Sequence, residues 1–227
     1  MRRMTDRPTE RTPVVLASAS PRRQRLISWL GIDAVVRPTG VDEPLDLPVS
    51  PAELAEGHAA TKARAASVAA PGSLCLGFDT VVVLDGTPLG KPESDEDARR
   101  MLAALSGRHH DVITGVALAN HGEVLRSFAV VTDVEMRPLG PAEVERWLSR
   151  GEHLGCAGAY NIEHHLARVT EDECFQNVAG LPLCHLYAEL ASLGAVCVPE
   201  LVPPVERCDA TLGRRCRLGP ALCGLTP

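Results

Sequence analysis

Two serines and two arginines gather at the start of a predicted helix, within residues 18–23. Ser20 suits the N-cap position and Pro21 the first helical position, so the helix is expected to begin here. Arg22 and Arg23 then lie in the first turn, where cations oppose the helix dipole by about 0.3–1 kcal/mol each. With Ser18, Ser20 and the free backbone N–H groups they form an anion site suited to a phosphate chain. The alternative is an exposed basic turn beside an ordinary serine cap.

Asp79 is an acidic residue inside an otherwise apolar predicted strand, residues 74–84. A carboxylate in that position must be paired, bound to a metal or placed beside a cleft, unless it starts the strand and faces water. Glu43, which follows Asp42 in a predicted loop, is the second candidate oxygen ligand for a Mg²⁺-like ion. The alternative for Glu43 is a solvated acidic loop.

The chain holds 21 arginines and only two lysines, Lys62 and Lys91. A sequence with so strong a preference for arginine is expected to keep a lysine where a compact point charge is useful, as in a contact with phosphate. Lys62 falls within an alanine-rich predicted helix, and Lys91 lies in a turn before Pro92. Chance placement is the alternative for either one.

Several classes of protein are disfavoured by charge and motif content. The formal net charge of −6 and the aromatic content of 3% argue against nucleic-acid and membrane-surface binding. The histidines include two adjacent pairs, at 109–110 and 164–165, without the spacing of a zinc hydrolase. No P-loop, dinucleotide-binding or nucleophile-elbow motif is present, so phosphate binding must use another scaffold.

Alternating strand and helix patterns must position these side chains. Strands are expected over residues 13–18, 34–37, 74–84, 111–119 and 123–135, the last two as a hairpin. Helices are expected from the Ser20 cap to Gly31 and over residues 51–69, 95–105, 141–148 and 182–193. The mixture of hairpin and crossover connections predicts an α/β fold with a mixed sheet.

The two ends of the chain differ in composition from this central part. Residues 1–12 are polar and predicted to be disordered, with neither a secretory signal nor a membrane span, so a cytoplasmic protein with reduced thiols is expected. Residues 199–207 are predicted to be a stiff linker to a tail, residues 199–227 in all, rich in Pro, Cys and Arg. Cys208, Cys216 and Cys223 in this tail lack the Cys-x2-Cys spacing of structural zinc sites, which disfavours a metal site there.

An ordered set of motifs over residues 13–195 resembles the Maf family of nucleoside triphosphate pyrophosphatases. The set is far more specific than any one of its parts. The matching segments are Leu16–Arg23, Val41–Glu43, Thr61–Ala63, Asp79–Val82, Leu89–Pro92, Leu105–Arg108, Thr114–Val116, Ala157–Ile162 and Asn177–Leu183.

The resemblance implies a fold and an activity. The fold is a Maf- and ITPase-like α/β domain over residues 13–198, in which helices flank a long mixed sheet and two lobes enclose a central cleft. The activity is hydrolysis of nucleoside triphosphates to the monophosphate and pyrophosphate with a divalent cation, Mg²⁺ or Mn²⁺. Family members are linked to septum formation, and a homodimer without nucleic-acid or membrane partners is expected.

The resemblance also assigns roles to residues. Ser18, Arg22 and Arg23 would bind the phosphates, and Thr80 and Glu163 would also bind the substrate. Glu43 and Asp79 would hold the metal and the attacking water, and Lys62 and Lys91 would neutralise the triphosphate. Asp79, Glu43, Lys62 and Lys91 are therefore the expected catalytic residues.

Base selectivity is the point at which the sequence departs from its family. Asp79-Thr80 resembles the branch that acts on dTTP and UTP, yet Glu163-His164 stand where that branch usually has Gln-Gly. A carboxylate only accepts hydrogen bonds whereas an amide also donates them, and replacing Gly by His removes backbone freedom. Two alternatives follow: the same reaction with another base preference, or a non-catalytic nucleotide-binding regulator of septation.

Overall fold

The computed structural model describes residues 12–194, 198 and 200–225. Most of the N-terminal segment predicted to be disordered, residues 1–11, lies outside the described residues. The strand order in the single sheet is β2-β1-β3-β5-β6-β7, with β4 paired to β3 away from this path. The strands are β1 Val14–Leu16, β2 Ala34–Val36, β3 Leu74–Leu84, β4 Thr87–Leu89, β5 His109–Asn120, β6 Glu123–Met136 and β7 Ala167–Arg168.

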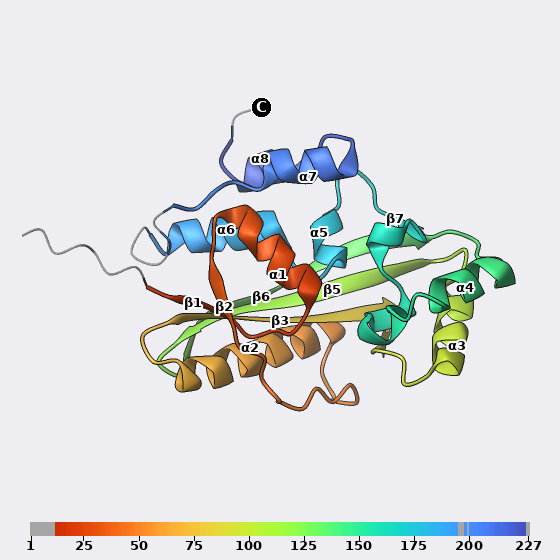
Figure 1. Cartoon of the computed structure of the whole chain (residues 1–227), viewed down its shortest axis with the longest axis horizontal. Coiled ribbons are helices and arrows are strands. Elements are labelled where there is room, and N and C mark those ends of the chain that lie inside the picture. The colour runs from red at the N-terminus through yellow and green to blue at the C-terminus, as the bar shows by residue number, and fades with distance from the viewer. Residues whose placement is uncertain (1–11, 195–197, 199, 226–227) are drawn as a thin grey trace, which may run out of the picture.

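The sheet is mixed, as predicted. Strand β1 pairs in parallel with β2 and β3, whereas the β3–β4, β3–β5, β5–β6 and β6–β7 pairs are antiparallel. Because β1 runs parallel to β3 and its last residue, Leu16, pairs with Leu76, residue 18 and the loop to the first helix follow beside the middle of β3. The antiparallel β5–β6 hairpin forms the long spine of the sheet (Figure 1).

Helices cover both faces of the sheet. The helices are α1 Pro21–Ile27, α2 Pro51–Ala69, α3 Asp95–Leu105, α4 Pro141–Leu148, α5 Phe175–Val178, α6 Leu183–Ser192, α7 Val205–Leu212 and α8 Leu218–Leu222. Helix α2 lies along one face, whereas α1, α5 and α6 lie on the other, with α7 and α8 outside them (Figure 1). Short 3-10 turns occupy Ser28–Leu30, His153–Gly155, Ala157–Ala159 and Ile162–His164.

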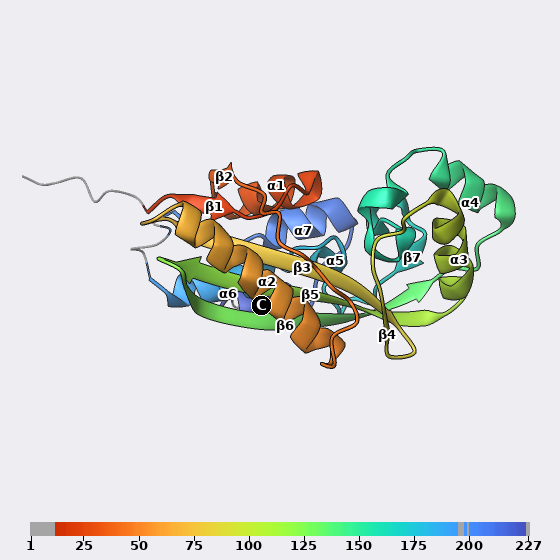
Figure 2. The same ribbon diagram turned by 90° about the horizontal axis from the view of Figure 1, so that it is seen from below.

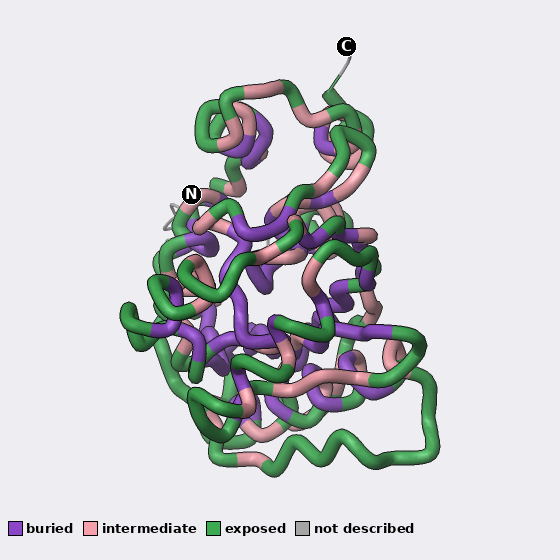
Figure 3. The backbone as a smooth tube through the Cα atoms, turned by 90° about the vertical axis from the view of Figure 1, so that its right-hand side faces the viewer, coloured by how far each residue is buried: buried purple, intermediate pink, exposed green. Residues whose placement is uncertain are grey.

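Two lobes share the long strands. In Figure 2 the lobe with β1, β2, α1 and α2 stands at one end, and the lobe with α3, α4 and β7 at the other. Strands β3, β5 and β6 run through both. Buried positions concentrate in the middle of the molecule, while the outer loops are exposed (Figure 3).

Helix α2 approaches the sheet unusually closely because two strand residues are glycines. A Cβ on Gly77 of β3 would come within 2.1 Å of the carbonyl oxygen of Ala59, and one on Gly115 of β5 within 2.1 Å of the carbonyl oxygen of Ala55. Ala63 completes the small-residue face of the helix toward the sheet. This close packing brings the neighbouring side chains of α2 within hydrogen-bonding reach of β3.

The local signals that predicted the helices are present as expected. Ser20 accepts a hydrogen bond from the Arg23 amide, and Ser50 forms a full capping box with Glu53. Gly31, with φ of 75°, ends the first helical stretch. The sequence did not predict β4, β7, α5 or the 3-10 turns, all of which are very short. It predicted one continuous helix to Gly31, whereas the last turn of that stretch is a 3-10 helix.

The predicted linker over residues 199–207 is wrong in its last part, because helix α7 begins at Val205. Pro204 takes the N-cap position there, so the proline-rich run leads into a helix instead of preventing one. The C-terminal segment then folds back against the domain, and α8 packs on α6. Over the described residues, no helix is both long and apolar enough to span a membrane.

Candidate active site

A cavity of about 1120 Å³ lies in the cleft between the lobes. Its lining includes every residue predicted to catalyse the reaction or to bind the substrate or metal: Ser18, Arg22, Arg23, Glu43, Lys62, Asp79, Thr80, Lys91 and Glu163. These residues come from segments spread over 145 positions of the chain, so only the folded structure brings them together.

The cavity borders β3 where that strand lacks a partner on one side. Strand β1 pairs with β3 only as far as Leu76, and β4 pairs with it only from Val82 onward. Residues 77–81 therefore present an open edge to the cleft. Successive side chains of a strand point to opposite faces, and at such an edge both Asp79 and Thr80 border the same cavity.

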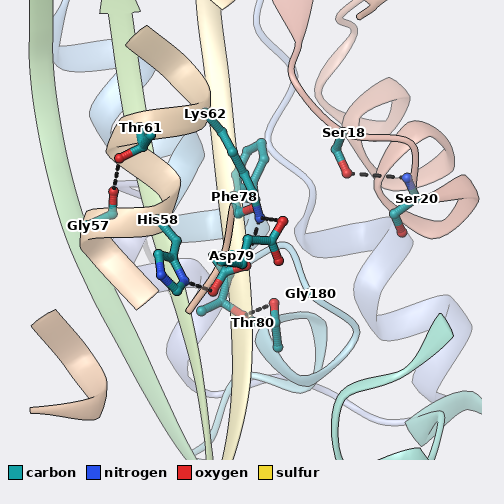
Figure 4. Close-up of polar contacts among 12 residues, drawn as sticks. Ser18, Ser20, Gly57, His58, Thr61, Lys62, Phe78, Asp79, Thr80 and Gly180 are labelled. Atoms are coloured by element: carbon teal, nitrogen blue, oxygen red, sulfur yellow. Dashed lines mark hydrogen bonds and ion pairs between the residues drawn. The ribbon is translucent and has the colours of Figure 1, made fainter. Parts of the chain in front are cut away.

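Lys62 links the two acidic residues of the site, and Figure 4 shows it beside one of them, Asp79. Its Nζ lies 2.7 Å from Asp79 Oδ1 and 2.8 Å from Glu43 Oε1, and donates to the Phe78 carbonyl oxygen at 3.3 Å. The ammonium group is buried, and these three acceptors match its three N–H donors. Lys62 therefore holds both carboxylates at a fixed separation.

His58 is a site residue that the sequence analysis missed. It stands one helical turn before Lys62 on α2, and its Nδ1 lies 3.2 Å from Asp79 Oδ2 (Figure 4). The ring is buried, and its Nε2 has no hydrogen-bond partner among the residues that the structure describes. The available signal was the i, i+4 spacing to Lys62, which places both side chains on one face of the helix.

The Asp79 carboxylate is held in its ionised form. Burial of the group raises its pKa, but Lys62, Arg23 and His58 lower it, and the net effect is a pKa below the usual range. Asp79 lies in the middle of β3 and is 6% exposed, which rules out the alternative of a solvated residue at the strand's start. An ionised, oriented carboxylate in a cleft is suited to water activation or to metal binding.

Arg23 ties three segments of the site together. Its Nε donates to the Gly180 carbonyl oxygen at 2.8 Å, and its two Nη groups donate to Ser18 Oγ at 3.2 Å and Thr80 Oγ1 at 2.9 Å. The guanidinium lies 5.8 Å from the centre of the Phe78 ring. Burial lowers its pKa to about 10, so Arg23 stays charged at neutral pH and contributes a fixed positive charge.

A chain of hydroxyl groups extends this network through the sheet. Thr80 Oγ1, which accepts from Arg23, lies 2.9 Å from Thr114 Oγ1, and Thr114 donates to the Asn177 carbonyl oxygen. Since Thr114 has one proton and uses it on Asn177, Thr80 is the donor to Thr114. Thr80 therefore uses its one proton within the protein but keeps an acceptor lone pair, and its predicted contact with substrate stays a prediction.

Arg22, unlike Arg23, has hydrogen-bond donors that are not used within the described residues. Its Nη1 donates to Cys156 Sγ at 3.2 Å, but its Nε is buried and has no acceptor in the described part of the chain. Lys91 lies at the rim of the cavity, 61% exposed, with its Nζ 3.9 Å from Glu43 Oε2. An anion in the cavity would meet an unpartnered guanidinium N–H of Arg22 and the exposed ammonium group of Lys91.

Glu163 does not stand free in the cavity. Its carboxylate forms an ion pair with Arg25 of α1, and Asn161 Oδ1 accepts from its backbone N–H at 3.1 Å. Together, the Arg25 guanidinium donates hydrogen bonds and the Glu163 carboxylate accepts them, as the single glutamine amide usual at this position would do. Arg25 thus supplies the donors that the Glu163 carboxylate lacks.

The left-handed backbone conformation that glycine favours occurs at His165 and not at His164, the residue that replaces the usual glycine. His165 has φ of 59° and caps the Ile162–His164 turn, whereas His164 is inside that turn. The His164 ring lies 4.9 Å from the Trp147 ring, centre to centre, and its Nε2 lies 3.2 Å from Glu152. The residue in place of glycine is therefore packed into the cavity wall without left-handed backbone.

Glu43 and Asp79 are the side chains that could hold a divalent cation here. Both are hard oxygen donors, and both contact the ammonium group of Lys62. Among the described residues no group of three His, Cys, Asp or Glu side chains has the arrangement of an ion site. Two carboxylates fit an ion that takes its remaining ligands from substrate phosphates and water, as Mg²⁺ commonly does.

Comparison with known proteins shows the family to which the chain belongs. A family model described as "Maf-like protein" matches residues 13–193. The dTTP/UTP pyrophosphatase of Symbiobacterium thermophilum is 43% identical over 185 residues, which cover 80% of this chain and 94% of that protein. The dTTP/UTP pyrophosphatase of Anaeromyxobacter sp. is 45% identical over 186 residues, which cover 79% and 87%. That of Bacteroides thetaiotaomicron is 40% identical over 185 residues, which cover 79% and 95%.

Proposed function

The chain belongs to the Maf family, and from that premise we propose that it is a nucleoside triphosphate pyrophosphatase that acts on dTTP and UTP. The substrate class is that named for its relatives. The observation that carries the proposal is the buried Lys62, which joins Asp79 and Glu43 beneath a cavity with unpartnered cationic donors. A binding protein has less need of two carboxylates fixed around one ammonium group.

The reaction is attack of water on the α-phosphorus, with release of pyrophosphate. Arg22 and Lys91 bind the β- and γ-phosphates and neutralise the charge that develops on the leaving group. Ser18 and Arg23 shape the wall against which the phosphates lie. Asp79 is ionised and aimed into the cleft, so that it can hold the attacking water and accept its proton.

A divalent cation, Mg²⁺ or Mn²⁺, would be held by Glu43 and Asp79. When bound, it supplies positive charge at the phosphate oxygens and lowers the pKa of bound water. Lys62 keeps the two carboxylates in place for it. His58 fixes the orientation of Asp79 from the other oxygen of that carboxylate.

A second candidate is the same reaction with a different base preference. The Arg25–Glu163 ion pair supports it, because this pair replaces a neutral amide at the cavity wall. A third is a non-catalytic regulator of septation, which the paired carboxylates disfavour. The homodimer rests on the family resemblance and the cytoplasmic location on the sequence, and both belong to the proposal.

Pyrophosphate release from a panel of canonical and modified nucleoside triphosphates, with Mg²⁺ and with Mn²⁺, tests the proposal. Turnover of dTTP and UTP is expected in the wild-type protein, with loss of turnover but retained nucleotide binding in Asp79→Asn. Asp85→Asn is the matched control, because Asp85 is an exposed residue at the end of the same strand. Turnover of other bases only would favour the second candidate, and nucleotide binding without any turnover the third.

A further inference from the structure

The loop between β2 and α2, residues 37–50, carries Glu43 to the cavity. This loop contains neither helix nor strand. Among the described residues, no backbone hydrogen bond joins residues 38–48 to another element. In Figure 2 the loop runs to the end of α2 that lies nearest β4. Side-chain contacts must therefore hold Glu43 in place.

The contacts of Glu43 itself are ion pairs. Its carboxylate lies 2.8 Å from Lys62 Nζ and 3.9 Å from Lys91 Nζ. The Glu43 side chain is 34% exposed, so water screens these pairs in part. On a loop without backbone hydrogen bonds, such pairs alone leave the carboxylate free to move with the chain. A further contact is needed to keep Glu43 beside Lys62.

Leu45, two residues after Glu43, supplies an apolar contact. A Cβ on Gly90 would stand 2.6 Å from Leu45 Cδ1 and 3.8 Å from its Cγ, so the Leu45 side chain packs directly against the Gly90 backbone. Gly90 follows β4 and does not have a positive φ. Its lack of a side chain, and not an unusual backbone conformation, therefore makes room for Leu45.

Gly90 is itself held in the cavity wall. Its carbonyl oxygen accepts from the Gly158 N–H at 2.9 Å, and Gly158 lies in the Ala157–Ala159 turn. Gly90, Ala157 and Leu45 all line the cavity. Leu45 therefore fastens an otherwise unbonded loop to a hydrogen-bonded part of the wall.

Pro44 couples Leu45 to Glu43, because it stands between them. Its ring fixes φ near −65°, and the residue before a proline is restricted to extended backbone. Few free torsions then separate the Leu45 contact from the Glu43 carboxylate. A displacement of Leu45 should therefore move Glu43 as well.

We propose that Leu45 is a positioning residue for Glu43. Packed against Gly90, it holds the β2–α2 loop so that the Glu43 carboxylate stays beside Lys62. The inference rests on the proposed function, in which Glu43 and Asp79 hold the cation. Loss of the contact should therefore lower kcat more than it changes nucleotide binding.

Steady-state kinetics with dTTP measures this effect. Leu45→Ala should lower kcat about tenfold and change KM by less than about threefold. Leu45→Met should recover most of the loss, because its flexible side chain can still reach Gly90. Leu47→Ala is the matched control, since Leu47 lies on the same loop and is 45% exposed against 37% for Leu45. It should leave kcat and KM unchanged.

Double substitutions show whether the contact acts through Glu43. Gly90→Ala places a methyl group where Leu45 packs, so it should also lower kcat. The two changes together should cost no more than about tenfold, whereas independent effects would multiply. In a Glu43→Gln background, Leu45→Ala should lower kcat by less than about twofold. A tenfold loss in that background overturns the proposal.

A carbodiimide cross-link reports the position of Glu43 without enzymatic activity. The reagent joins a carboxylate to an amine that it contacts, and the chain has only two lysines, so mass analysis of peptides identifies a Glu43–Lys62 bond. We expect its yield to fall at least about threefold in Leu45→Ala and in Gly90→Ala. Leu47→Ala should keep the wild-type yield.

The cross-link also separates this inference from the proposed function. Absence of the Glu43–Lys62 bond in the wild type, or equal yields in wild type and Leu45→Ala, overturns the proposal. A raised KM with unchanged kcat in Leu45→Ala also overturns it, because Leu45 would then bind substrate. If the wild type shows no turnover but the yield falls as expected, the positioning role stands and the proposed function fails.

Discussion

Nδ1 of His58 lies 3.2 Å from Oδ2 of Asp79, and both side chains are buried. The other oxygen of the same carboxylate, Oδ1, is bound by Lys62, one turn further along α2. The carboxylate is therefore held at both oxygens by one face of one helix. That face lies so close to β3 because Gly77 and Gly115 have no side chains.

Substitution of His58 should impair catalysis more than binding. His58→Ala leaves Asp79 held at one oxygen only, so we expect kcat to fall about 10–100-fold with little change in KM. His58→Asn, which retains a polar donor on a shorter side chain, should recover part of the loss. Steady-state kinetics with dTTP, with folding verified by thermal denaturation, measures both parameters.

The control for this substitution is His121→Asn in the exposed β5–β6 turn, where the left-handed backbone suits asparagine. It should leave kcat and KM unchanged. An unchanged kcat in His58→Ala would show that Lys62 alone orients Asp79.

Lys62 and Lys91 should behave oppositely when each is replaced by methionine. Lys62→Met leaves Asp79 without its buried partner, and an uncompensated buried charge costs about 3–5 kcal/mol. We expect kcat to fall by at least about 1000-fold and the free energy of unfolding to drop. Lys91→Met removes an exposed charge, so KM should rise while stability changes little.

Urea denaturation and steady-state kinetics on both variants separate these effects. Lys62→Arg is a further variant of interest, because a planar guanidinium does not fit between three acceptors matched to an ammonium group. Equal loss of stability in Lys62→Met and Lys91→Met would contradict the assignment of Lys62 as the buried link.

Elements with local signals could be predicted from the sequence, and those without could not. The Ser50–Glu53 capping box and Gly31 mark helix ends within a few residues, so α1 and α2 were predicted close to their true bounds. Helix α5 spans only four residues, Phe175–Val178, and depends on tertiary hydrogen bonds from Asn177. No local pattern encodes such an element.

The site divides in the same way. The arginine bias of the composition pointed to Lys62 and Lys91, the acidic residue inside an apolar strand pointed to Asp79, and the family motifs supported Glu43. His58 carried no such mark, since a lone histidine in an alanine-rich helix is most often a core or surface residue. Its role depends on the close approach of α2 to β3, and the glycines that permit that approach lie on other segments.

The Arg25–Glu163 ion pair should determine base selectivity. Glu163→Gln removes its charge and releases Arg25, which restores the amide usual in the dTTP/UTP branch. We expect the ratio of kcat/KM for dTTP over other nucleoside triphosphates to change by about 10-fold in either direction, with the reaction itself retained. Competition assays with mixed substrates measure this ratio directly.

Arg25→Gln tests the same pair from the other side. Arg99→Gln is the control, because Arg99 forms an exposed ion pair with Glu145 on the outer helices. An unchanged substrate ratio in both Glu163→Gln and Arg25→Gln would place base recognition elsewhere in the cavity.

His110 should make the protein less stable as the pH falls. Its ring is buried and its Nε2 lies 2.8 Å from Tyr160 Oη, and burial lowers its pKa from 6.5 to about 4. Between these values the unfolded chain binds a proton that the folded chain does not, so stability is lost as the pH falls from about 6.5 to about 4. The loss is at most about 3 kcal/mol. Urea denaturation at several pH values should show a smaller loss for His110→Gln than for wild type, while equal pH dependence of both would contradict a neutral buried His110.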